Sequence, residues 1–194
     1  MYNNLKGQVK LKDCLSDPFS ITIGLRQGCN LSPYLFNMYV NDLPNLLGKA
    51  NCNPVLLDNT KINILMYADD MLLLSYSEHG LQRALNILQI YCTKWQLVVN
   101  EKKTKVIIFN KNSHKSKFTY QGKQLETVQQ YTYLGIAFHK SGTFTRAKKD
   151  LEVKAKKAYF GIRTALRNCS PNPKLCIRLF DVIVKPILLY CSEI

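Results

Sequence analysis

The sequence contains no long apolar run and no pair of cysteines spaced as metal ligands. Its N-terminal stretch, MYNNLKGQVKLKDC, lacks the apolar core of a signal peptide, and no run approaches the ~20 apolar residues that a membrane span requires. We therefore expect an intracellular chain that has no membrane as a partner.

The seven cysteines are an odd number, include no Cys-x-x-Cys pair and stand apart from the three histidines. This pattern argues against a zinc site and against a disulfide framework, and it favours buried, reduced thiols. Hydrophobic residues make up 46% of the 194 residues, so the chain can bury one sizeable core and disorder is not expected.

Acidic residues are scarce and unevenly distributed. The chain has 13 Asp or Glu against 27 Lys or Arg, a formal net charge of +14. Nearly all of the excess lies in residues 101–174, where 17 basic residues stand against 4 acidic ones. So concentrated an excess predicts a polyanionic partner, most simply nucleic acid; the alternative for any single lysine is a solvated position on a helix face.

Two adjacent aspartates interrupt the apolar run ILMYADDMLLL at residues 64–74. Consecutive side chains of one strand point to opposite faces, whereas a hairpin with strands at 62–67 and 71–76 would place Asp69 and Asp70 together at its tip. The arms are almost wholly apolar, which favours a buried hairpin whose aspartates have a compensating ligand. The alternative is a solvated surface hairpin, since Asp is common in turns.

The first part of the chain also predicts a second hairpin and a helix. We expect a hairpin over 8–23 with its turn at Ser16-Asp17-Pro18. A loop that contains glycines follows, and Ser32-Pro33 is typical of the N-cap and first turn of a helix, which should end near Gly48.

Further elements follow from helical spacing and from turn residues. Helices are predicted over 81–95, 144–167 and 174–189, the last interrupted by Pro186. The stretch VVNEKKTKVIIF indicates a turn that leads into a strand, a hairpin is expected about Gln121-Gly122, and YTYLGIAF reads as one further strand.

Four strings in this order, GLRQGCNLSPYLFNMYVNDL, YADD, NEKKTKVIIF and YLG, resemble the reverse transcriptase domain of LINE-type (non-LTR) retrotransposons. The match spans essentially the whole chain, and its first string is the most specific. The resemblance implies an α+β fold, with a palm-like antiparallel sheet packed by helices over residues 1–138. It implies a basic, helical, thumb-like segment over residues 139–194.

The resemblance also implies an RNA-directed DNA polymerase, which transfers a nucleotide from a dNTP to the 3′ hydroxyl of a DNA primer on an RNA template. Asp69 and Asp70 match the catalytic carboxylates of that site, with Asp69 the better candidate for a direct metal ligand. Two divalent ions, Mg²⁺ or Mn²⁺, are expected in the complete enzyme, because they activate the attacking oxygen and hold the triphosphate.

Other residues match positions near the substrates of the family. The loop residues Gly24, Arg26, Gln27 and Gly28 correspond to the template and nucleotide site, and Tyr67 and Ala68 correspond to the primer end. Lys103 corresponds to a lysine near the leaving pyrophosphate, and Tyr133, Leu134 and Gly135 resemble a hairpin that supports the primer. Phosphate contacts are expected from Lys148, Lys149, Lys154, Lys156 and Lys157. The alternatives are an ordinary strand-to-helix turn for the loop, a core position for Tyr67, solvation for Lys103 and plain packing for Tyr133 and Leu134.

The resemblance is incomplete at one position. The family requires a further aspartate on an earlier palm strand, and none of Asp13, Asp17, Asp42 and Asp58 matches it. We therefore expect a fragment that lacks an upstream segment, including the fingers, and that is inactive alone. Two alternatives are a catalytically dead remnant that binds nucleic acid through residues 101–174, and a maturase-like RNA-binding protein.

Overall fold

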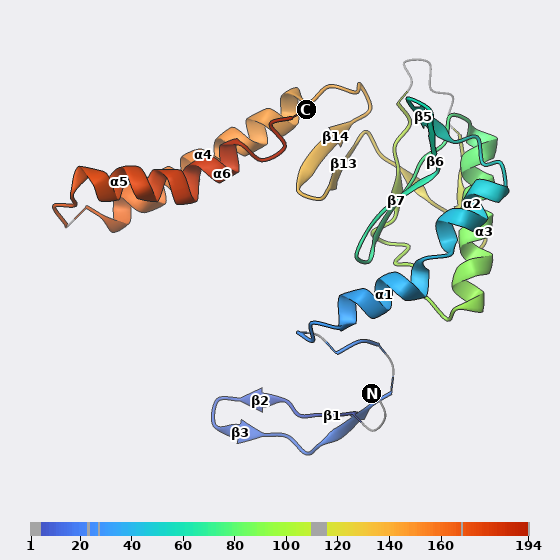
Figure 1. The fold of residues 1–194 in the computed structure, drawn as a ribbon, viewed down its shortest axis with the longest axis horizontal. Coiled ribbons are helices and arrows are strands. Elements are labelled where there is room, and N and C mark those ends of the chain that lie inside the picture. Colours follow the sequence, from blue (N-terminus) through green and yellow to red (C-terminus); the bar gives the residue numbers. More distant parts are fainter. Residues whose placement is uncertain (1–4, 23, 27, 110–115, 168, 194) are drawn as a thin grey trace. The chain divides into compact units, whose positions relative to one another are not determined.

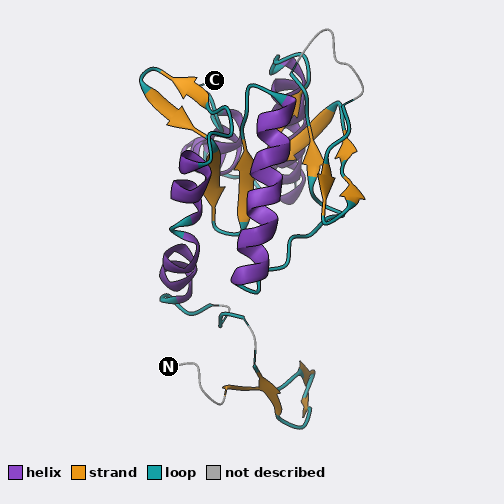
Figure 2. Cartoon of the chain, turned by 90° about the vertical axis from the view of Figure 1, so that its right-hand side faces the viewer, coloured by secondary structure: helices purple, strands orange, loops and turns teal. Residues whose placement is uncertain are grey.

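The computed structural model describes residues 5–22, 24–26, 28–109, 116–167 and 169–193 (Figure 1). The chain divides into two units, Met1–Lys94 and Trp95–Ile194. Helices and strands both contribute to the described chain (Figure 2). None of the helices within these ranges is long and apolar enough to cross a membrane.

The first unit contains four antiparallel strand pairs and three helices among its described residues. β1 pairs with β4, β2 with β3, β5 with β6 and β7 with β8. The elements in chain order are β1 (Leu5–Gly7), β2 (Lys10–Leu11), β3 (Cys14–Leu15), β4 (Phe19–Ile21), α1 (Ser32–Val40), α2 (Leu43–Lys49), β5 (Val55–Leu57), β6 (Thr60–Ile62), β7 (Ile64–Tyr67), β8 (Asp70–Leu73) and α3 (Glu78–Lys94).

The predicted N-terminal hairpin is present, but its turn lies elsewhere. Lys12 and Asp13 form the tip, between β2 and β3, rather than Ser16-Asp17-Pro18. Ser16 lies opposite Val9, whose N–H donates to the Ser16 hydroxyl at 2.9 Å and whose carbonyl accepts from the Ser16 N–H at 2.9 Å. The Ser16 hydroxyl thus accepts the hydrogen bond that a backbone carbonyl would accept in a regular strand pair. The two segments of the chain therefore still run side by side at Ser16, and the turn lies further along, at Lys12 and Asp13.

The helix predicted from Ser32 to Gly48 is two helices, α1 and α2. Pro44 lies in the first turn of α2, where its missing N–H costs nothing, whereas a continuous helix would have placed its ring against a carbonyl of the preceding turn. Asp42 therefore lies at the N-cap position between the two helices, where its side chain makes no capping hydrogen bond. The N-cap of α1 is Leu31, so the predicted capping role of Ser32 is wrong.

The core of the first unit lies between α2 and α3. Helical spacing predicts an apolar face at positions 81, 84, 85, 88, 92 and 95; the middle four are buried, whereas Leu81 and Trp95 are half-buried. The Tyr91 hydroxyl donates to the Asp42 carboxylate at 2.6 Å, and burial, with this bond, raises the pKa of Tyr91. The buried apolar residues are Val40, Leu43, Leu47, Cys52, Ala84, Leu85, Leu88, Tyr91 and Cys92.

The described residues of the second unit form three strand pairs, followed by a helical segment. β9 pairs with β12 in parallel, and β10–β11 and β13–β14 are antiparallel hairpins. The elements are β9 (Lys105–Val106), β10 (Thr119–Tyr120), β11 (Lys123–Gln124), β12 (Glu126–Thr127), β13 (Gln130–Tyr133), β14 (Ile136–His139), α4 (Thr145–Ala165), α5 (Pro173–Leu179), the π-helix η1 (Phe180–Val184) and α6 (Lys185–Leu188).

Most predictions for this unit hold and one is wrong. The helix predicted over 144–167 is α4, and the stretch VVNEKKTKVIIF contains a turn that leads into β9. The hairpin about Gln121-Gly122 is β10–β11, and the last helix is interrupted next to Pro186, where a π-helical turn precedes the residue that lacks an N–H. The stretch YTYLGIAF is not one strand, because Leu134-Gly135 turns the chain between β13 and β14. α4 packs against β14, η1 and α6.

The described chain is thus mixed α and β, with small, mainly antiparallel sheets. None of the seven cysteines, all of which lie within the described residues, forms a disulfide bond. Cys52 and Cys92 are buried, and burial raises the pKa of Cys52. Cys14 and Cys169 are exposed, so the expectation of buried thiols fails for these two, which lie at the tip of a hairpin and after the end of α4.

Candidate functional site

The two aspartates lie at the tip of the β7–β8 hairpin, as the sequence predicts. Tyr67 pairs with Asp70, the first residue of β8, so that Ala68 and Asp69 form a two-residue turn. Ala68 has a positive φ of 51°, whereas Asp69 does not, which is the combination of a type II′ turn. Glycine is usual at this position, and an L-residue there costs roughly 1–2 kcal/mol.

The tip of this hairpin is exposed. Tyr67 is 65% exposed, so the alternative that it is plain core is wrong. Leu65 is 44% exposed, and the hairpin is half-buried rather than buried. Within the described ranges, the side-chain carboxylates of Asp69 and Asp70 have no hydrogen-bond or ion-pair partner. Two adjacent, uncompensated carboxylates repel each other, and a bound cation would relieve this repulsion.

The carboxylate pair is an incomplete metal site by itself. Its oxygens are the hard ligands that Mg²⁺ prefers. In the part of the chain that the structure describes, no group of three or more His, Cys, Asp or Glu side chains could hold a metal ion. Any ion at this tip therefore needs ligands from outside the described residues, from a substrate or from water.

The base of the same hairpin is tightly connected to its surroundings. The Leu74 N–H donates to the Asn63 carbonyl at 2.8 Å, and the Ser75 hydroxyl donates to the Cys52 carbonyl at 2.8 Å. Gly80 of α3 lies against this junction, where an added Cβ would come within 2.4 Å of both the Cys52 carbonyl oxygen and the Ser75 hydroxyl oxygen. Glycine at this position lets α3 approach the end of the hairpin.

The predicted substrate loop precedes α1. Gly24 and Gly28 have φ of 94° and 82°, and no atom lies within 4 Å of a Cβ added to either, so the backbone conformation rather than crowding requires glycine. Arg26 is exposed, and its carbonyl accepts from the Ser32 hydroxyl at 2.7 Å, which ties the loop to the start of α1. Gln27, also predicted here, lies outside the described residues.

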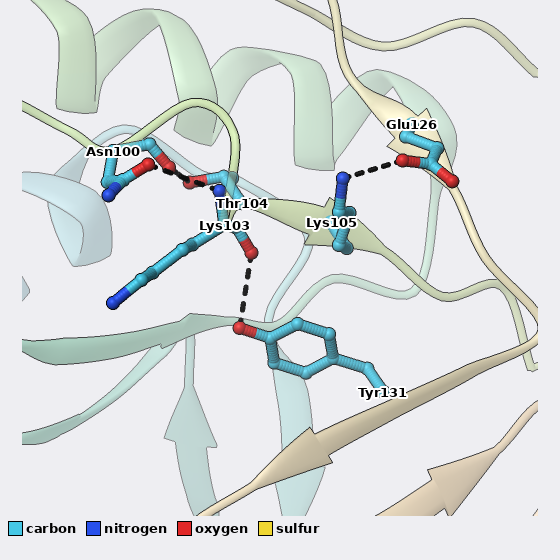
Figure 3. Close-up of polar contacts among 6 residues, drawn as sticks. All are labelled: Asn100, Lys103, Thr104, Lys105, Glu126 and Tyr131. Atoms are coloured by element: carbon cyan, nitrogen blue, oxygen red, sulfur yellow. Dashed lines mark hydrogen bonds and ion pairs between the residues drawn. The ribbon is translucent and has the colours of Figure 1, made fainter.

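Lys103 lies in a turn whose backbone is held from two sides (Figure 3). Its N–H donates to the side-chain oxygen of Asn100 at 3.2 Å, and the Thr104 N–H donates to the Asn100 carbonyl at 3.0 Å. From β13, the Tyr131 hydroxyl donates to the Lys103 carbonyl at 3.2 Å. The backbone of Lys103 is therefore fixed, while its side chain is exposed.

The neighbouring charges leave the Lys103 ammonium uncompensated. Lys105 pairs with Glu126 directly across the β9–β12 ladder at 2.6 Å, and Lys123 pairs with Glu101 at 2.8 Å. Lys103 has no ion pair with any described residue, and its ammonium points away from the Lys105–Glu126 pair (Figure 3). This arrangement offers a cation to an anionic ligand, although a solvated lysine has the same appearance.

The predicted primer-support residues form the turn of the β13–β14 hairpin. Tyr133 pairs with Ile136, and both turn residues have positive φ, 46° at Leu134 and 83° at Gly135, which defines a type I′ turn. The Tyr190 hydroxyl donates to the Leu134 carbonyl at 2.6 Å.

The lysines predicted to contact phosphate lie on the exposed faces of α4. The buried face of this helix carries Ala147, which packs with Ile136 and Ala137 of β14. Lys156 pairs with Glu152, and the hydrogen bond from Lys156 lowers the pKa of that carboxyl. The exposed lysines without an ion pair to a described residue are Lys148, Lys149, Lys154 and Lys157.

Sequence reasoning missed three side chains that fix these turns. Ser32 was assigned to cap a helix, although its hydroxyl holds the Arg26 carbonyl. Tyr131 lies two residues before Tyr133 on β13, so the two residues share one face of the strand. This spacing is only a weak indication that Tyr131 makes a structural contact there. Tyr190 is 56 residues from Leu134, and no local pattern indicates their contact.

A family model described as "Reverse transcriptase (RNA-dependent DNA polymerase)" matches residues 3–138. The chain is 27% identical over 199 aligned residues to "RNA-directed DNA polymerase from mobile element jockey" of Drosophila funebris, an alignment that covers 97% of this chain and 21% of that protein.

Two further relatives show the same pattern of coverage. "Probable RNA-directed DNA polymerase from transposon BS" of Drosophila melanogaster is 31% identical over 147 residues, which are 70% of this chain and 16% of that protein. "Retrovirus-related Pol polyprotein from type-1 retrotransposable element R2" of Popillia japonica is 27% identical over 159 residues, 77% of this chain and 24% of that protein. The chain thus spans between 16% and 24% of the length of these three relatives.

Proposed function

Because the chain belongs to the reverse transcriptase (RNA-dependent DNA polymerase) family, we propose that it forms part of an RNA-directed DNA polymerase of a non-LTR retrotransposon. Residues 1–138 would contribute to the palm, and residues 139–194 would form a basic, thumb-like segment. The substrates are a DNA primer on an RNA template and dNTPs, and the reaction joins a nucleotide to the primer 3′ hydroxyl.

The observation that carries this proposal is the β7–β8 tip. Asp69 and Asp70 are exposed at the end of a strained two-residue turn, and no described residue compensates their charge. Strain and uncompensated like charges persist where a ligand supplies what the protein does not. Divalent cations are the ligands that fit two adjacent carboxylates.

Members of this family generally use divalent metal ions. When bound, two Mg²⁺ or Mn²⁺ ions would activate the 3′ oxygen and hold the triphosphate. Asp69 in the turn and Asp70 at the start of β8 would hold these ions, with Asp69 as the direct ligand. Because the described residues include no third metal-binding side chain nearby, the rest of the ligand set would come from outside them.

The other predicted residues take supporting roles in this proposal. The exposed ammonium of Lys103 would face the leaving pyrophosphate, and the Tyr131 hydroxyl would keep its backbone in place. The template and the incoming nucleotide would lie near the loop residues Gly24, Arg26, Gln27 and Gly28. The primer end would lie near Tyr67 and Ala68. The turn formed by Tyr133, Leu134 and Gly135 would support the primer.

Primer extension on an RNA template with Mg²⁺ tests this function. The proteins to compare are residues 1–194, a longer protein in which this chain is joined to its natural upstream sequence, and the Asp69→Ala variant of each. We expect no extension by residues 1–194, because a missing fixed carboxylate costs orders of magnitude in rate. The longer protein should extend the primer, and Asp69→Ala should abolish that extension.

Two results would contradict the proposal. Extension by the longer protein that survives Asp69→Ala would remove the β7–β8 tip from the active site. Extension by residues 1–194 that disappears in their own Asp69→Ala variant would show that the chain already contains the complete ligand set.

The proposed nucleic-acid partner also rests on α4. Four of its exposed lysines have no ion pair with a described residue, so they are available to phosphates. Charge-reversing substitution of Lys154, Lys156 and Lys157 to Glu should weaken binding of an RNA–DNA duplex by about tenfold or more and should flatten its salt dependence. The matched control is reversal of Lys6 and Lys10 in the N-terminal hairpin, which should change the affinity less.

A fluorescence-anisotropy titration at several salt concentrations measures both effects. Equal losses of affinity in the two sets of variants would show that the excess of basic residues does not form a localised binding surface. Affinity that does not change with salt would contradict phosphate contacts altogether.

A second candidate function is nucleic-acid binding without catalysis. It is favoured by the combination of uncompensated lysines on α4 with the absence of a three-residue metal group in the described chain. The longer protein separates the two candidates, since a catalytically dead protein would bind the duplex with the expected salt dependence and extend nothing.

A further inference from the structure

The turn at the tip of β13–β14 is not fixed by its own sequence. A type I′ turn needs positive φ at both central residues, which Asn-Gly or Gly-Gly adopts readily. Here Leu134 occupies the first position with φ of 46°, although a left-handed conformation costs an L-residue with a Cβ roughly 1–2 kcal/mol. A contact from elsewhere in the protein would help to stabilise this conformation.

Tyr190 makes such a contact. Leu134 and Gly135 lie between the paired residues Tyr133 and Ile136, so the Leu134 carbonyl has no partner in the β13–β14 ladder. The Tyr190 hydroxyl donates to this carbonyl at 2.6 Å. Its ring also covers Gly135, where an added Cβ would lie 3.5 Å from the nearest ring carbon.

Tyr190 is itself held by the helical segment. It lies in the turn after α6, and the next residue, Cys191, has φ of 55° and packs against a cluster that contains Ile136 and Ala147. α4 packs against both α6 and β14. The end of the C-terminal helix and the hairpin therefore form one packed group, in which the Tyr190 hydroxyl reaches the exposed tip.

We propose that Tyr190 is a positioning residue for the Leu134-Gly135 turn, and that through this turn it sets how the protein holds the recessed 3′ end of a primer on its template. This inference rests on the proposed role of Tyr133, Leu134 and Gly135 in primer support. Tyr190 touches the turn and not the reacting atoms. It therefore acts on the geometry of the support, and α4 supplies the general attraction to the duplex.

The matched variants are Tyr190→Phe and Tyr159→Phe. Each removes one hydroxyl and keeps the ring, and both tyrosines are 46% exposed. Tyr159 contacts Phe160 edge to face at 5.5 Å, and its hydroxyl makes no hydrogen bond to a described residue. Tyr159→Phe is therefore the control for loss of a hydroxyl in the same unit.

The experiment measures affinity of residues 1–194 for two RNA–DNA duplexes of equal length, one blunt and one with a recessed DNA 3′ end. We expect wild type and Tyr159→Phe to prefer the recessed end. In Tyr190→Phe, the ratio of recessed-end affinity to blunt-duplex affinity should fall by about three- to tenfold, which is the size expected for one hydrogen bond between neutral groups. The affinity for the blunt duplex should stay unchanged. Hydrogen exchange should also become faster in the Tyr133–Ile136 amides of Tyr190→Phe only.

Each other result has a definite meaning. A recessed-end preference that survives Tyr190→Phe overturns the positioning role and leaves the proposed polymerase function standing. Equal weakening of both duplexes in Tyr190→Phe also overturns it, because a purely structural defect would act on all binding alike. Absence of any preference in wild type, in contrast, removes primer support from this turn and with it the premise of the inference.

Discussion

The hairpins β7–β8 and β13–β14 share a plan and differ in where the protein holds them. In each, a tyrosine ends the first strand and pairs with the first residue of the second, across a two-residue turn. A residue other than glycine begins each turn at positive φ, Ala68 in one and Leu134 in the other. Both turns therefore carry local strain that their own sequences do not relieve.

The surroundings of the two turns are opposite. β7–β8 is connected at its base, through Ser75 and the close approach of Gly80, while its tip has two carboxylates without described partners. β13–β14 is connected at its tip, where Tyr190 donates to Leu134. A tip left without protein contacts is suited to bind ions, whereas a tip held by the protein is suited to present a fixed surface.

The largest expected effect concerns the base of β7–β8. Gly80→Ala should destabilise the chain by about 3 kcal/mol, because the new Cβ would lie 2.4 Å from a backbone carbonyl oxygen and α3 would have to move away. Urea unfolding followed by circular dichroism measures the loss. The control is Gly48→Ala in α2, where an added Cβ meets nothing within 4 Å and the helix should gain stability by about 0.5–1 kcal/mol.

A neutral result for Gly80→Ala would mean that the hairpin base is loosely packed. In that case the contrast between a fixed base and a free tip would not explain how β7–β8 presents its aspartates.

The second prediction concerns the free tip. Asp70→Asn should leave the metal-free protein as stable as wild type or slightly more stable, because it removes a repulsion between adjacent charges. It should abolish the stabilisation by Mn²⁺ or Mg²⁺, which for wild type is about 1.4 kcal/mol at a metal concentration ten times the dissociation constant. Thermal melts of both proteins with and without metal measure the two effects.

Asp58→Asn is the control, since Asp58 also lies in a turn at a hairpin tip, between β5 and β6, but has no adjacent carboxylate. A large loss of metal-free stability in Asp70→Asn, with the metal response intact, would assign the aspartates a structural role.

Much of the local structure could be predicted from the sequence, because short-range patterns determine it. Helical spacing of apolar residues predicted the helix whose positions 84, 85, 88 and 92 are buried, and the apolar arms predicted the β7–β8 hairpin. The predicted second strand began at Met71, one residue after the observed start of β8 at Asp70. Pro44 is also a local signal, because it lies in the first turn of α2 and marks the break between this helix and α1. These features depend on neighbours within a few residues.

The features that local patterns do not predict depend on distant residues. YTYLGIAF contains no standard hairpin turn, and Tyr190, far along the chain, contributes to the conformation of Leu134-Gly135. The Tyr131 contact with Lys103 spans 28 residues and likewise leaves no local pattern. The roles of Asp69 and Asp70 came from family resemblance, because two turn aspartates alone are chemically ambiguous.

The third prediction sharpens the comparison between the two turns. Ala68→Gly should stabilise the chain by about 0.5–1 kcal/mol, because relief of the left-handed strain at φ of 51° exceeds the entropy that glycine loses on folding. Leu134→Gly relieves the same kind of strain but removes a side chain that is only 38% exposed, so its gain should be smaller or reversed. Urea unfolding of both variants gives the comparison. If Ala68→Gly destabilises the protein instead, the Ala68 side chain has contacts that fix the β7–β8 tip, and that tip is not the free end that its two carboxylates indicate.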